Sequence, residues 1–93
     1  MDFDEFMQTL HQKSPPKTKP MLEALWYDRK GDWHRAHDIV QDINGSMASR
    51  IHAYLHRKEG DLGNAGYWYS RAGKSRPEVD LDSEWEELVR ELL

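Results

Sequence analysis

A short motif occurs twice in the chain and constrains its fold more than any other feature. Gly31-Asp32-Trp33-x-x-Ala36 returns 29 residues later as Gly60-Asp61-Leu62-x-x-Ala65. In each copy the glycine allows the positive φ of a sharp interhelical turn, and the aspartate can cap the helix that follows. The alanine leaves room for two helices to approach closely. The repeat therefore predicts two stacked helical hairpins, at about residues 20–44 and 46–73, with Ser46 capping the second one.

Helical periodicity extends to both ends of the chain. Asp2 and Glu5 form a capping-box pattern ahead of a short apolar face, which ends where two prolines follow Ser14. Ser83 and Glu86 predict a last capped helix at about residues 83–93, and its apolar face comprises Trp85, Leu88, Val89 and Leu92. No stretch alternates with period two for long enough to form a strand. We therefore expect one all-α domain over residues 1–93, with five to six helices: two stacked antiparallel hairpins and a capping helix at each end.

The positions of small residues, turn glycines and aromatic residues in the hairpins resemble those of the tetratricopeptide repeat. In the second copy the family's small, glycine, aromatic and proline positions fall on Ala53, Gly60, Ala65, Tyr69, Ala72 and Pro77. The first copy matches at Ala24, Tyr27, Gly31 and Ala36, but Val40 stands where the family has an aromatic residue, and no proline follows. The spacing of 29 is also shorter than the family's period of about 34. The resemblance covers residues 20–77 and implies a module that binds a peptide or protein.

Composition narrows the classes of function. The formal charge of −4 argues mildly against nucleic acid as a partner, because phosphate binding needs a basic surface. The chain has no cysteine, and no apolar run approaches the roughly 18–20 residues of a membrane span. The first residues are acidic where a signal peptide would be basic. We therefore expect a cytoplasmic protein that binds neither membrane nor nucleic acid. The run His52–Gly73 is also similar to a group of short bacterial proteins, which implies the same location.

The tetratricopeptide resemblance implies that the first helix of each hairpin lines a concave groove. Carried onto this chain, the groove positions are Leu25, Asp28, Arg29, Arg50, Tyr54, Arg57 and Lys58. Helix geometry alone also places Arg50, Tyr54 and Arg57 on one face, a basic strip that suits a carboxylate-bearing peptide. The acidic last helix, with Asp82, Glu84 and Glu91 among its carboxylates, is an internal rival for this strip. The leading hypothesis is a non-enzymatic module that binds an acidic peptide or protein without a cofactor.

The alternative is a small metal-dependent enzyme or sensor built on histidines. His34 and His37 are three residues apart, and His52 and His56 are four apart, so each pair can share one helix face. In an antiparallel hairpin about Asn44-Gly45 the four imidazoles could converge near Asp38, as a site for zinc or nickel. No HExxH motif, phosphate-binding glycine loop or cysteine nucleophile is present. The sequence therefore predicts no catalytic residue.

An aromatic run, Tyr67-Trp68-Tyr69, lies in the second hairpin. Neighbouring residues on a helix point about 100° apart, so at least one of these rings should be half exposed. The run is either hairpin core, packed with Ala53, Leu55, Leu62, Ala65 and Ala72, or one wall of a site. In the second case the site would be lined by His52, His56, Arg57, Asn64, Tyr67, Trp68 and Arg71.

Overall fold

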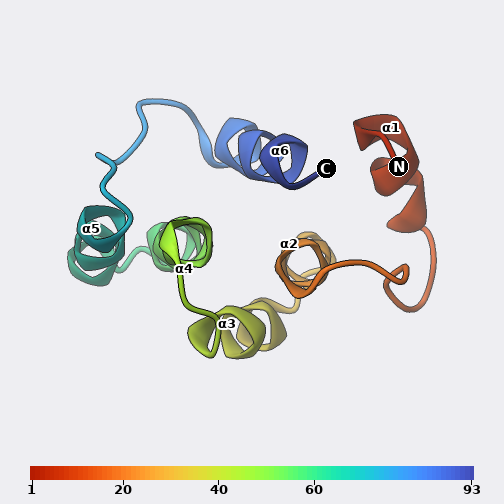
Figure 1. Ribbon diagram of the computed structural model, residues 1–93, viewed down its shortest axis with the longest axis horizontal. Coiled ribbons are helices and arrows are strands. Elements are labelled where there is room, and N and C mark those ends of the chain that lie inside the picture. The colour runs from red at the N-terminus through yellow and green to blue at the C-terminus, as the bar shows by residue number, and fades with distance from the viewer.

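Six α-helices and no strand make up the protein in a computed structural model that describes residues 1–93. Their bounds are α1 Phe3–Thr9, α2 Pro20–Arg29, α3 Trp33–Gln41, α4 Ser46–Glu59, α5 Leu62–Arg71 and α6 Leu81–Leu92 (Figure 1). The expected all-α class with five to six helices is confirmed. No helix is both long enough and apolar enough to cross a membrane.

The repeated motif forms two matching interhelical turns. Gly31 and Gly60 have φ of 91° and 88°, the left-handed region in which glycine is least strained. The aspartate after each glycine caps the next helix: Asp32 accepts a hydrogen bond from the Arg35 amide, and Asp61 accepts one from the Asn64 amide, each at 3.2 Å. As a result α2 packs against α3, and α4 against α5. The pairs stack because α3 also packs on α4 (Figure 1).

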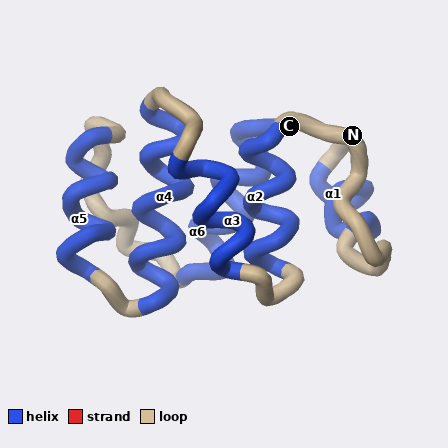
Figure 2. The backbone as a smooth tube through the Cα atoms, turned by 90° about the horizontal axis from the view of Figure 1, so that it is seen from below, coloured by secondary structure: helices blue, strands red, loops and turns tan.

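Helix α6 returns from α5 and lies against α2 and α4, the first helix of each hairpin (Figures 1 and 2). Its predicted apolar face is buried, with Trp85, Leu88 and Val89 at most 1% exposed. The Trp85 indole donates a hydrogen bond to the Leu25 carbonyl at 3.0 Å, which fixes α6 on α2. Phe6 of α1 packs against the Trp85 ring, at 6.1 Å between ring centroids. The end helices therefore complete the main core.

Several local predictions are corrected. Ser46 is the first residue of α4 rather than its cap; the cap is Gly45, at φ 113°, which offers no side-chain hydrogen bond. Helix α6 is capped by Asp80, which accepts from the Ser83 amide at 2.7 Å, so the helix begins at Leu81, before Ser83. Leu62, expected in the core, is 53% exposed. In contrast, the capping box of Asp2 and Glu5 is present as predicted.

Candidate metal centre

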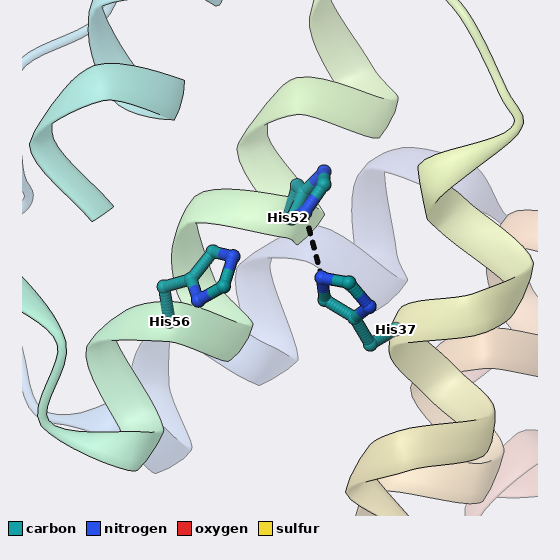
Figure 3. Close-up of side chains that lie close together, drawn as sticks. All are labelled: His37, His52 and His56. Atoms are coloured by element: carbon teal, nitrogen blue, oxygen red, sulfur yellow. Dashed lines mark hydrogen bonds between the residues drawn. The ribbon is translucent and has the colours of Figure 1, made fainter. Parts of the chain in front are cut away.

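Three of the four candidate histidines converge between α3 and α4. His37 belongs to α3, while His52 and His56 lie one turn apart on α4, and the three rings face one another (Figure 3). The Nε2 atoms of His37 and His52 are 2.9 Å apart. One nitrogen from each of the three rings lies within 4.8 Å of the other two. His34 is exposed and packs edge-on against the Trp33 ring, so the cluster has three histidines rather than the four considered from the sequence.

Packing of α3 on α4 sets the position of these rings. Ala36 and Val40 face the core, as expected. His37 follows Ala36 on the same helix and is therefore only partly buried, at the edge of the contact between α3 and α4. Opposite, Ile51 and Leu55 are fully buried, and each precedes one of the two α4 histidines. His52 and His56 are consequently only 6% and 9% exposed.

Two tryptophans enclose the histidine cluster. Trp33 stacks on His37 with 5.0 Å between ring centroids, and its indole donates to the Leu55 carbonyl at 2.7 Å. Trp68 of α5 stacks on His52 at 3.9 Å. Because each tryptophan packs flat on one imidazole, the rings are held within a few ångströms of one another by neighbours as well as by their own helices.

The surroundings favour the neutral forms of His52 and His37. Burial lowers the pKa of His52 to about 4, and the charges of His37 and His56 act in the same direction. Burial also lowers the pKa of His37, aided by His56 and opposed by Asp38 and Glu59. Neutral imidazole is the form that binds metal ions. Because the Nε2 atoms of His37 and His52 share a hydrogen bond, one of them carries a proton, which would have to move to Nδ1 before both could bind an ion.

His56 has a carboxylate behind it. Its Nδ1 lies 2.7 Å from Oε2 of Glu59, one turn later on α4. A carboxylate only accepts hydrogen bonds, so Nδ1 carries the proton and neutral His56 keeps its lone pair on Nε2. Metal-binding histidines commonly show this arrangement, in which the second nitrogen donates to a carboxylate. Glu59 was missed in the sequence, although its spacing of three from His56 was the available signal.

A cavity of about 250 Å³ adjoins the cluster and shares His52 with it. It lies where the end of α3, the start of α4 and the end of α5 meet, and is lined by Gln41, Ile43, Asn44, Gly45, Ala48, Ser49, His52, Trp68 and Arg71. His52, Trp68 and Arg71 were among the residues expected to line a site. Asn64 was expected there too, but it does not line the cavity, and its side chain donates to Asp61 at 2.8 Å. The aromatic run divides as helix geometry predicts: Tyr67 is 53% exposed and Tyr69 is 3% exposed.

The basic strip is not an open surface, because partners within the chain occupy it. Arg50 pairs with Glu91 at 2.7 Å and Arg57 with Glu84 at 2.8 Å, both on α6. Arg29 pairs with Asp82 at 3.0 Å, also on α6. Tyr54 is 2% exposed and donates to Asp28 at 2.7 Å, and Lys58 pairs with the same carboxylate at 2.9 Å. The acidic last helix, the internal rival considered from the sequence, is therefore the occupant.

No protein-family model matches the chain, and neither a curated protein nor a solved structure is similar to it. The geometry of the site is therefore the basis for a functional assignment.

Proposed function

We propose that the protein binds a first-row transition-metal ion, zinc or nickel, through His37, His52 and His56. The observation that carries this proposal is the approach of three ring nitrogens from two helices to within 4.8 Å of one another. Imidazole suits both ions, and three histidines are an established ligand set for zinc.

The spacing of the nitrogens supports this ligand set. Zinc–nitrogen bonds of about 2.0–2.1 Å at tetrahedral angles put ligand nitrogens about 3.3 Å apart. The His37–His52 separation of 2.9 Å is shorter than this, and no separation in the cluster exceeds 4.8 Å. No separation in the cluster therefore exceeds the tetrahedral spacing by more than about 1.5 Å (4.8 Å against about 3.3 Å).

Three protein ligands leave a fourth coordination position open, as in sites where zinc binds water or substrate. This arrangement fits the alternative of a metal-dependent enzyme or sensor better than a purely structural site, which is usually closed by four protein ligands. The hydrogen bond from His56 to Glu59 supports the same proposal because it orients the ring and increases its basicity.

Elemental analysis of purified, untagged protein tests the proposal. After dialysis against buffered zinc, we expect about one zinc ion per chain for the wild type, and a loss of retained zinc in His52→Gln and His37→Gln. His34→Gln and His11→Gln are matched controls, because these histidines are exposed and lie outside the cluster, and both should retain the ion. Glu59→Gln should weaken binding by about 10- to 100-fold.

Equal zinc retention in the wild type and in His52→Gln would contradict the proposal, provided that circular dichroism shows both chains folded. Binding of an acidic peptide or protein stays a prediction. It has less support than the metal site, because the charged groups assigned to it already have partners within the chain.

A further inference from the structure

The cavity beside His52 differs in charge from the rest of the molecule. The chain carries 17 acidic residues and only 13 lysines and arginines. None of the acidic residues lines the cavity, whose polar lining consists of Gln41, Asn44, Ser49, His52 and Arg71. A cavity with hydrogen-bond donors and a cation but no carboxylate is suited to an anion.

Ser49 supplies an unused polar group in this cavity. The residue as a whole is 9% exposed, and its hydroxyl makes no hydrogen bond within the protein. The hydroxyl is not one of the fully enclosed unpaired atoms, so it is accessible from the cavity, where a ligand or solvent molecule can bond to it. Ser49 lies in the first turn of α4, whose cap Gly45 offers no side-chain hydrogen bond. The first amides of the helix therefore also lack protein acceptors, and the helix dipole adds positive potential.

Arg71 supplies the charge. None of the six ion pairs in the protein includes it. Its guanidinium lies 5.2 Å from the centroid of the Trp68 ring and donates to the Tyr67 hydroxyl at 3.1 Å. The two aromatic residues hold the arginine at the cavity, and its fork of donors suits a planar carboxylate or a phosphate group.

We propose that this cavity binds a small oxyanion, a carboxylate or phosphate group, through Arg71, the Ser49 hydroxyl and the first amides of α4. Its volume of about 250 Å³ corresponds to roughly eight water molecules at about 30 Å³ each, which limits the ligand to a small free molecule. The inference goes beyond the proposed function, since anion binding does not require the metal ion. The two sites share His52, so a bound anion would lie next to the metal.

Nuclear magnetic resonance titration of the metal-free full chain with sodium acetate, and separately with sodium phosphate, tests the inference. Ionic strength is held constant with sodium chloride, because exposed charges are screened over about 10 Å at 0.1 M. We expect saturable shifts of the backbone amides of residues 45–49 and of the Trp68 indole. Saturation by acetate supports a carboxylate ligand, and saturation by phosphate supports a phosphate ligand.

Variants separate a specific site from general charge attraction. Arg71→Met and Ser49→Ala should each weaken anion binding by at least about tenfold, as expected for lost hydrogen bonds to a charged group. Arg76→Met is the matched control, because Arg76 is exposed, has no ion pair and does not line the cavity, and its binding should be unchanged. Absence of saturable shifts with both anions, or equal affinity in the wild type and Arg71→Met, would overturn the inference. Zinc binding without Arg71-dependent anion binding would contradict only the anion site. Arg71-dependent anion binding without zinc binding would contradict only the metal site.

Discussion

At the scale of single residues, one buried carboxylate joins three helices. Glu84 of α6 is 4% exposed and accepts hydrogen bonds from Arg57 of α4 at 2.8 Å and from the Tyr69 hydroxyl of α5 at 2.7 Å. A buried charge with good partners is tolerated, but removing one member leaves the others desolvated and unpaired. Glu84 therefore specifies how α6 sits on the second hairpin.

We predict that Glu84→Ala lowers the free energy of unfolding by about 3–5 kcal/mol, because Arg57 and Tyr69 both lose their acceptor. That loss is a large part of the total stability of a small domain, which is on the order of 5 kcal/mol at the low end. Urea denaturation followed by circular dichroism measures it. Glu87→Ala, at an exposed position on the same helix, should change stability by less than about 0.5 kcal/mol. Similar losses for the two variants would show that Glu84 has no special role.

The histidine cluster also predicts a pH dependence of stability in metal-free protein. Burial lowers the pKa of His52 to about 4 in the folded chain, against about 6.5 for an ordinary histidine, so the unfolded chain binds the proton more readily. The stabilising effect of neutral His52 is therefore complete above about pH 6.5 and is lost as the pH falls toward 4, by up to about 3 kcal/mol. The groups that face it are His37 from α3 and His56 from α4, while Trp68 from α5 is uncharged.

Denaturation midpoints measured between pH 7.5 and 5 check this dependence. His52→Gln should show a flatter profile over the same range, because glutamine does not titrate. Parallel profiles for the two proteins would indicate that His52 is not the residue responsible.

At the scale of elements, α6 is part of the core rather than an optional cover. Its buried face was predictable from sequence, because four apolar residues at helical spacing must face something. Its start was not: Asp80 and Ser83 are both good caps, and only the tertiary position of Leu81 against the core decides between them. The opposite charges of α6 and the basic strip were the only sequence signal that the two could pair. The structure shows three such ion pairs between them.

We predict that deletion of residues 81–93 unfolds the chain or causes it to associate, because the deletion exposes the apolar faces of α2 and α4. Trp85→Ala should cost about 3–5 kcal/mol, the range for removing a buried aromatic side chain. Analytical ultracentrifugation and thermal melting distinguish the outcomes. A truncated chain that stays monomeric with an unchanged melting temperature would contradict a core role for α6.

At the scale of the whole molecule, stability is distributed unevenly. The main core draws on α1, α2, α3, α4 and α6, whereas α5 contributes to a small separate cluster of Ala53, Ala65 and Tyr69. Both Leu62 and Tyr67 of α5 are 53% exposed. The proposed metal and anion sites lie at the junction of this helix with the main core, through Trp68 and Arg71.

Hydrogen exchange should therefore show the lowest helix protection in α5, apart from the short α1, because local opening there exposes the least apolar surface. Zinc should raise protection in α5 as well as in α3 and α4, because Trp68 stacks on His52. Exchange measured by mass spectrometry with and without zinc tests this. Equal protection of α4 and α5 in the metal-free chain would contradict the division of the core.

Features that depend on neighbouring residues could be predicted from the sequence, whereas features that depend on how the helices pack could not. The glycine turns, the aspartate caps and the helix count follow from residues within one turn of each other. The histidine spacing allowed four imidazoles to meet, but the rotation of α3 on α4 brings in His37 and leaves His34 exposed. Likewise Ser49 could not be identified as a cavity residue, because its exposure depends on where α5 packs.

Calorimetric titration of metal-free, untagged protein with zinc tests whether His37, His52 and His56 form a metal site. We expect one ion to bind per chain, with a rise in melting temperature. At a free zinc concentration 100 times the dissociation constant, the stabilisation is about 2.7 kcal/mol, or roughly 10–20 °C for a domain of this size. His34→Gln should give the same result, and His52→Gln should give neither binding nor stabilisation. Absence of stoichiometric binding to the folded wild-type chain would contradict the proposed metal site.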